Sequence, residues 1–236
     1  MIDKSEELAL NKLEYILKPA YLPCEGFNNG CNLCWNPNEG HIPRGFLGAT
    51  STIRDVEIIM VFAEPGDPHK DEKYESASFK SALNRTYKSM KDGTDRFHEN
   101  VRSILNMFFP GEDFDAQLKK TWMTESVLCS ASKECGSVPK EVIEKCSNNY
   151  LLKQISLFFD GIANPPTIIA LGRKASVRLD RLKLNEKKIP FIYVAHPSPP
   201  GANRKEAVIS WKKAAEDFKL AKSHNVDKYQ INTSFE

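Results

Sequence analysis

The alternation of short apolar runs with longer amphipathic stretches predicts a three-layer α/β/α sandwich around a central four-stranded parallel sheet. The apolar runs have the length of buried strands and cover residues 58–62, 121–128, 167–171 and 191–195. No repeat, low-complexity tract or linker divides the 236 residues. We therefore expect a single domain over 1–236, with an N-terminal helix within 1–20 and a tail over 224–236.

Apolar residues recur at helical spacing in four further segments, which predicts amphipathic helices around the sheet. Turn-forming residues, glycine and proline separate these segments from the strands. The segments are 5–18, 75–108 (which Asp92 and Gly93 divide into two helices), 140–159 and 205–222.

The composition is that of a globular protein, with 41% hydrophobic and 27% charged residues. No stretch of about 18 apolar residues is present, and the first ten residues lack the basic-then-apolar layout of a signal peptide. We therefore expect a cytoplasmic, monomeric protein without a membrane partner. A net charge of +2 is too small to indicate a nucleic-acid partner by itself.

We expect no disulfide framework among the cysteines of a chain without an export signal, because the cytosol keeps thiols reduced. Metal ligation and simple burial remain open. Cys31 and Cys34 form a C-x2-C pair, a spacing that lets two thiolates bind one metal or cluster. Cys129 follows the second strand, and Cys146 lies in the helix that packs back on the sheet. The other two are Cys24 and Cys135.

Ionisable residues stand at the ends of three predicted strands. Glu64 follows the run 58–62, Glu125 lies within the second strand, and His196 follows the last one. Since the carboxyl ends of parallel strands share one edge of a sheet, these three side chains can converge on one crevice. A solvated turn glutamate and a loop histidine bonded to backbone are the plainer interpretations of Glu64 and His196.

The motifs at the first and last strand ends resemble those of the uracil-DNA glycosylase superfamily. Pro65-Gly66 follows the first strand and His196-Pro197-Ser198 follows the last, in the order of that superfamily. The cysteine layout is similar to that of its iron-sulfur branch, families four and five. The resemblance implies a DNA glycosylase with a 4Fe-4S cluster on Cys31, Cys34, Cys129 and Cys146; a zinc site on the same cysteines is the alternative.

The resemblance also implies roles that suit the chemistry of base removal. Breaking an N-glycosidic bond builds positive charge on the sugar and negative charge on the departing base. Glu64 would stabilise the sugar cation and orient or deprotonate water, while His196 would donate a hydrogen bond to the base. The base must first be flipped out of the duplex. Phe79, or alternatively Tyr74, would stack on it, next to Ala63.

The loop after His196 is the expected DNA contact. Its proline-rich sequence can act as a wedge and its basic end can bind phosphate. The residues expected to contact DNA are Ser198, Pro199, Asn203 and Arg204, together with Arg173 at the end of the third strand.

Two positions depart from the iron-sulfur branch. Glu64 stands where family one enzymes keep a catalytic Asp, and Glu125 stands where members that excise uracil carry an Asn. A carboxyl group suits the N4 amine of cytosine better than O4 of uracil, and a protonated Glu125 could also reach cytosine N3. We therefore expect a modified cytosine, as in phage genomes, and a role in antiviral defence.

Two other functions remain open. One is a DNA repair glycosylase for uracil or deaminated bases, in which Glu125 merely bonds to backbone. The other is a non-catalytic, DNA-binding iron-sulfur protein that keeps the fold without turnover.

Overall fold

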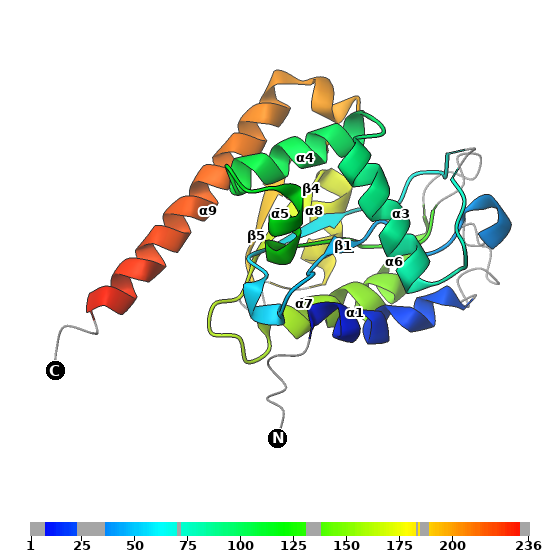
Figure 1. The fold of residues 1–236 in the computed structure, drawn as a ribbon, viewed down its shortest axis with the longest axis horizontal. Helices are drawn as coiled ribbons and strands as arrows, with labels where there is room; N and C mark the ends of the chain where they lie inside the picture. The colour runs from blue at the N-terminus through cyan, green and yellow to red at the C-terminus, as the bar shows by residue number, and fades with distance from the viewer. Residues whose placement is uncertain are drawn as a thin grey trace.

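The computed structural model describes residues 8–22, 36–69, 72–130, 138–182, 184 and 189–231, with side chains of the last helix described as far as Ser223. It is an α/β structure in which helices cover both faces of one sheet (Figure 1). The strands are β1 (Leu47–Gly48), β2 (Ile58–Phe62), β3 (Thr121–Glu125), β4 (Thr167–Leu171) and β5 (Phe191–Val194).

The α-helices of the described chain are α1 (Ala9–Leu17), α3 (Phe79–Asp92), α4 (Arg96–Phe108), α5 (Phe114–Lys120), α6 (Lys140–Cys146), α7 (Leu152–Phe159), α8 (Arg173–Arg181) and α9 (Lys205–Ile231). Short 3-10 turns are η1 (Lys18–Tyr21), η2 (Pro37–Glu39), η3 (Ile53–Asp55) and η6 (Gly201–Asn203), and η5 (Ser147–Leu151) is a π-helical segment between α6 and α7. None of the helices in these ranges is long and apolar enough to cross a membrane.

The sheet has five strands in the order β1-β3-β2-β4-β5, so the prediction of a four-stranded, wholly parallel sheet is wrong. The strands β2 to β5 are parallel to their neighbours, whereas β1 pairs antiparallel with β3 at the edge. Two residues are too few to form a periodic pattern, which explains why the sequence does not predict β1. The α/β class and the mostly parallel sheet are confirmed.

Gly48 makes the pairing of β1 with β3 possible. It has a φ of 107°, and a Cβ at this position would lie 1.9 Å from the carbonyl oxygen of Thr121. Only glycine combines this backbone conformation with so close an approach. The pairing of the edge strand β1 therefore requires a residue without a side chain at position 48.

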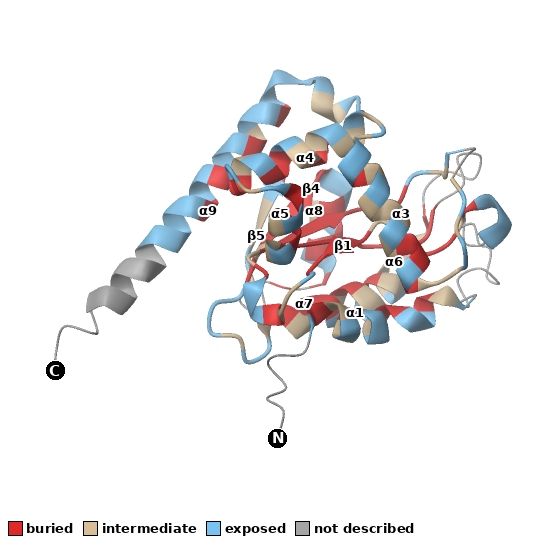
Figure 2. Ribbon diagram, viewed as in Figure 1, coloured by how far each residue is buried: buried red, intermediate tan, exposed pale blue. Residues whose placement is uncertain are grey.

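Alternate residues of β2 enter two separate cores. Ile59 and Val61 pack in the core beneath α1, α7 and α8, whereas Met60 and Phe62 pack in the core beneath α4, α5 and α9. Figure 2 shows the buried strands between these two helical layers. Burial on both faces explains why β2 and β4 read as continuous apolar runs.

Three helices differ from the sequence-based expectation. Helix α5 is not predicted, because it is short and has little periodicity. The helix expected over 140–159 is interrupted by the π-helical segment η5. Helix α9 continues to Ile231 and is longer than the helix expected over 205–222, because no Pro or Gly stops it there. Figure 1 shows α9 projecting beyond the sheet.

We expect Gly48→Ala to lower the free energy of unfolding by about 2 to 5 kcal/mol, since positive-φ strain adds to the overlap with Thr121. Gly111→Ala is the matched control, because Gly111 has a φ of 81° but no atom within 4 Å of its Cβ position. That control should lose only about 1–2 kcal/mol. Urea denaturation of both variants measures the difference, and equal losses would contradict the close contact.

Candidate functional site

Glu64, Glu125 and His196 line a single cavity of about 330 Å³ at the carboxyl edge of the sheet. Glu125 is the last residue of β3 and pairs in register with Phe62, the last residue of β2. Glu64 and His196 each follow the end of a strand by two residues. The parallel strands thus bring together side chains that are far apart in the sequence, in a volume at the lower end of the range for ligand pockets.

Both carboxylate oxygens of Glu64 face cations. Lys174 Nζ lies 2.7 Å from Oε1, and Arg178 Nη2 lies 2.5 Å from Oε2. Burial raises the pKa of Glu64, but the positive charges of Arg178 and Lys174 outweigh burial and leave the pKa below its ordinary value. Glu64 is therefore ionised at neutral pH.

Arg178 connects Glu64 to the ends of two strands. Its side chain is buried, and its guanidinium also donates to Ser126 Oγ at 2.9 Å and to the carbonyl oxygen of Ala63. Ser126 Oγ donates to the same carbonyl at 2.7 Å. Ala63, expected next to the base, thus contributes its backbone oxygen to this network.

Glu125, unlike Glu64, lies in surroundings that raise the pKa of its carboxyl group. It is 5% exposed, and its Oε2 atom makes no hydrogen bond to the described residues. Burial raises its pKa well above the ordinary value, and the negative charge of Glu64 adds to the effect. The pKa values of the two carboxyl groups in this cavity are therefore shifted in opposite directions, that of Glu64 downward and that of Glu125 well upward.

Gly45 leaves the space that Glu125 occupies. A Cβ at Gly45 would lie 2.6 Å from Glu125 Cγ and 2.7 Å from Oε1, and Gly45 has a φ of 87°. Any larger residue would displace the carboxyl group from the cavity wall. The loop that carries Gly45 is held by buried Arg44, which donates to Ser130 Oγ at 2.6 Å and pairs with Glu72 at 3.3 Å.

His196 is held as a neutral hydrogen-bond donor. The backbone N–H of Ser198 donates to its Nδ1 atom at 3.1 Å, so the ring proton of the neutral form is on Nε2. Burial lowers the pKa of His196. The ring stacks on Phe97, with centroids 6.1 Å apart, and meets the edge of Phe62.

The structure does not bring Phe79 to this cavity. Its side chain is 5% exposed and stacks on Phe46, at a centroid distance of 5.1 Å, within the core beneath α1 and α7. Tyr74, the alternative, does line the cavity, and so does Phe97, which the sequence did not indicate. Either ring is available for stacking on a ligand.

A polar wall formed by α3 and the start of α4 also lines the cavity. Asp95 is the N-cap of α4 and accepts hydrogen bonds from the backbone N–H and Nδ1 of His98 at 3.0 and 2.9 Å. His69 Nε2 lies 3.5 Å from the other oxygen of Asp95. The remaining polar residues of this wall are Arg85, Thr86 and Ser89.

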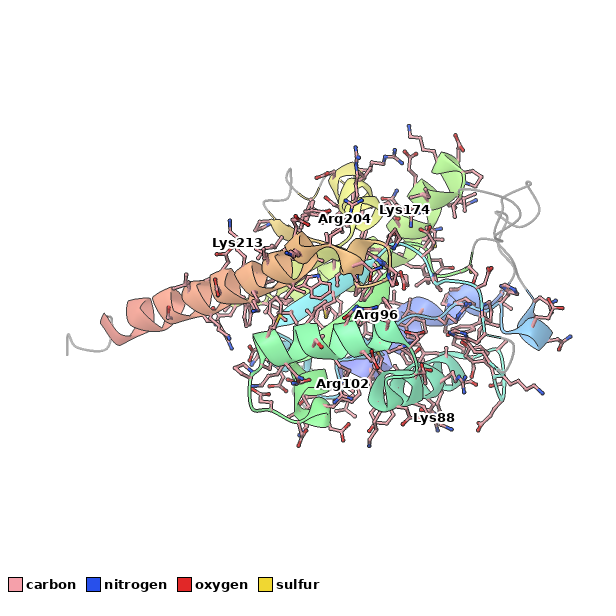
Figure 3. All side chains as sticks on the ribbon, turned by 90° about the horizontal axis from the view of Figure 1, so that it is seen from above. Lys88, Arg96, Arg102, Lys174, Arg204 and Lys213 are labelled. Carbon is pink, nitrogen blue, oxygen red and sulfur yellow. The ribbon has the colours of Figure 1, made fainter. Side chains whose placement is uncertain are left out.

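Two of the predicted DNA contacts line a second hollow of about 380 Å³ that shares His196 with the first. Arg173 and Arg204 line the second hollow, and Ser198 lines the first. Pro199 and Asn203 belong to the connecting loop, Asn203 at the end of η6. Figure 3 shows Arg204 and Lys174 on the same side of the domain, away from Lys88 and Arg102.

Two of the four predicted cluster ligands lie in the described chain and pack together. Cys129 and Cys146 contact a small apolar cluster with Val127 and Val138. Cys31 and Cys34 lie outside the described residues, as do Cys24 and Cys135. Within the described ranges no group of three or more His, Cys, Asp or Glu side chains could hold a metal. The proximity of the two cysteine-bearing segments fits a shared cluster.

Arg178 and Lys174 are the main site residues that sequence reasoning missed. They are four residues apart on α8, a spacing that places both on one helical face directed at the end of β2. That signal was present in the sequence once α8 was assigned. The sequence carried no such signal for Arg44, because the loop that contains Arg44 has no periodic pattern. No protein-family model and no curated protein matches this chain significantly.

We expect Glu125→Gln to change how stability depends on pH. The folded protein keeps the Glu125 proton where the unfolded chain has lost it, so this group's contribution falls as the pH rises above about 4.3. The wild type should lose stability relative to Glu125→Gln by at most about 1.4 kcal/mol per pH unit above that value. Denaturation between pH 4 and 8 measures this difference. The exposed carboxyl in Glu75→Gln is the control, and a pH-independent difference for Glu125→Gln would contradict a neutral Glu125.

Proposed function

We propose that this protein is a DNA glycosylase that flips a modified cytosine out of the duplex and hydrolyses its N-glycosidic bond, leaving an abasic site. The observation that carries the proposal is that buried Glu125 shares one cavity with Glu64 and His196. Burial raises the pKa of Glu125 well above its ordinary value, which favours its protonated form. DNA is the partner, and the protein would act as a monomer.

A neutral Glu125 offers cytosine one donor and one acceptor. One oxygen can accept from the N4 amine while the other donates its proton to N3. Protonation of N3 makes cytosine a better leaving group, because negative charge on the departing base is reduced. Uracil gains nothing in this way, since its N3 already carries a hydrogen. The protonation state of Glu125 thus favours a cytosine-derived base.

Glu64 and His196 would act on the two parts of the breaking bond. The ionised carboxylate stabilises positive charge that develops on the sugar, and Nε2–H of His196 donates to the base oxygen as it gains negative charge. The ring of Phe97 or Tyr74 stacks on the flipped base in place of Phe79. These roles need no proton transfer to His196, which agrees with its lowered pKa.

The polar wall with Asp95, His98 and His69 supports a substituent on the cytosine ring. A group at C5 extends on the same side of the ring as the N4 amine, beyond Glu125. Hydroxyl groups both donate and accept hydrogen bonds, so a hydroxymethyl or hexosyl group would find partners on this wall. Cytosines of this kind are typical of phage DNA, hence the proposed role in antiviral defence.

Phosphates of the bound DNA would lie over the second hollow. Arg173 and Arg204 line it, and guanidinium groups bind phosphate in a bidentate manner. Ser198, Pro199 and Asn203 belong to the loop that separates this hollow from the base cavity, and Pro199 is suited to act as a wedge.

A 4Fe-4S cluster on Cys31, Cys34, Cys129 and Cys146 would be structural. When bound, it supplies a cross-link between the N-terminal loop and the sheet, because hydrolysis of a glycosidic bond involves no redox step. A zinc ion on the same thiolates would supply the same cross-link.

A repair glycosylase for uracil is the second candidate, because a neutral Glu125 can pair with uracil as well. The proton of a neutral carboxyl group can move to the other oxygen, so Glu125 can also donate to O4 and accept from N3–H of uracil. Uracil and cytosine would then form the same number of hydrogen bonds with Glu125. They differ in that only cytosine becomes a better leaving group through protonation at N3.

The direct test is incubation with duplexes carrying uracil, cytosine, 5-hydroxymethylcytosine or glucosylated hydroxymethylcytosine, followed by alkali to cleave abasic sites. Strand scission is expected only with the modified cytosines. Scission with uracil alone would establish the repair function, and no scission would favour the non-catalytic DNA-binding protein.

Variants of the site separate catalysis from binding in the same assay. We expect Glu64→Gln and His196→Ala to lower excision by about 100-fold or more while DNA binding is retained. Glu125→Asn should shift the preference toward uracil, since an amide cannot protonate cytosine N3. Unchanged base preference in Glu125→Asn would contradict the assignment of Glu125.

If the protein binds a 4Fe-4S cluster, we expect it to be brown and to absorb blue light. Iron content should be lost in Cys129→Ser and Cys146→Ser and kept in the control variants Cys24→Ser and Cys135→Ser. A colourless protein that contains zinc would contradict the iron-sulfur cluster.

A further inference from the structure

Each carboxylate oxygen of Glu64 contacts a different cation, and the cation at Oε1 is the amine of a lysine. Lys174 Nζ is 2.7 Å from that oxygen, and Arg178 occupies Oε2. The two cations differ in freedom: the Arg178 side chain is 6% exposed and bonded at three points, whereas the Lys174 side chain is 67% exposed. The group best placed to reach a sugar that lies beside Glu64 is therefore the amine of Lys174.

We propose that Lys174 is a nucleophile and that the protein has a second activity, cleavage of the DNA strand at abasic sites. The proposal rests on the proposed function in one respect, that the deoxyribose lies next to Glu64. Lysine amines react with carbonyl carbons to form Schiff bases, and the ring-opened sugar of an abasic site presents an aldehyde at C1′.

The position of Lys174 on α8 supports this role. The helix begins at Gly172, where a Cβ would lie 3.0 Å from the ring of His196, so the first turn of α8 is held against the proposed catalytic histidine. The neighbouring Arg173 lines the hollow assigned to phosphates. Lys174 thus lies between the side chains proposed to act on the sugar and those proposed to bind the backbone.

The chemistry balances without an oxidant or reductant. Water takes a proton from the Lys174 ammonium, and Nζ attacks C1′; the proton returns through water to the C1′ oxygen, which leaves as water, and a protonated imine forms. Loss of a proton from C2′ to Glu64 then breaks the C3′–O bond, and the 5′-phosphate of the downstream strand departs. Water hydrolyses the imine, which releases an unsaturated aldehyde and restores the amine.

The test uses abasic duplex DNA prepared beforehand from uracil-containing DNA by a separate enzyme, so its result does not depend on base excision by this protein. Borohydride reduces an imine to a stable covalent adduct, and the adducted lysine is identified by mass spectrometry. The proteins compared are the wild type, Lys174→Arg, Lys174→Ala and the control Lys213→Ala, which changes an exposed lysine of α9.

We expect the wild type and Lys213→Ala to give the adduct at residue 174 and to cleave the strand without alkali. Lys174→Arg keeps the positive charge beside Glu64 but cannot form an imine, so the adduct should fall about tenfold or more. DNA binding and excision of modified cytosine are measured on the same variant, so that a specific loss of the adduct is distinguished from a general loss of the site.

Two outcomes would overturn the proposal. One is the absence of an adduct with the wild type, and the other is an equal yield of adduct with Lys174→Arg. In either case Lys174 is a phosphate contact and a charge partner of Glu64. If the protein does not excise bases, the adduct can still form on the abasic DNA prepared beforehand. The experiment therefore tests strand cleavage by Lys174 separately from the proposed glycosylase activity.

Discussion

The site depends on one buried guanidinium. Arg178 reaches from α8 to the ends of β2 and β3, where it binds the Glu64 carboxylate, the Ala63 carbonyl and the Ser126 hydroxyl. A buried cation is tolerated only when its hydrogen-bonding groups are paired, so these contacts also fix the position of α8 against the sheet. Because Glu64 remains charged beside Arg178, it raises the pKa of the neighbouring Glu125.

The two carboxyl groups of this cavity, Glu64 and Glu125, lie in contrasting surroundings. Glu64 has two cations at hydrogen-bond distance, whereas Glu125 is enclosed by β3 and by the backbone at Gly45. An ionised group can stabilise developing positive charge, and a protonated group can supply a hydrogen to a base, so the pair would meet both requirements of the proposed cytosine removal. Glu64 also holds the amine of Lys174 at Oε1, the contact from which we propose the second activity.

Glycines at three positions allow the close approaches on which the site relies. Gly48 lets β1 join the sheet, Gly45 leaves room for Glu125, and Gly172 permits α8 to begin against His196. All three have positive φ angles and would bring a Cβ within 3.0 Å of another atom. The sequence contains twelve glycines, and nothing in their spacing distinguishes these three from those that only end helices.

The sequence by itself determined the four parallel strands and the residues at their ends, though not the edge strand β1, because apolar runs that stop at turn formers identify parallel strands. Glu64, Glu125 and His196 share a cavity for that reason. Only the tertiary structure decided which aromatic rings reach the cavity, since Phe79 begins α3 with its ring turned into the core while Phe97 packs on His196. It likewise decided the protonation of the two carboxyl groups. Burial and neighbouring charge set a pKa, and both arise from residues distant in the chain.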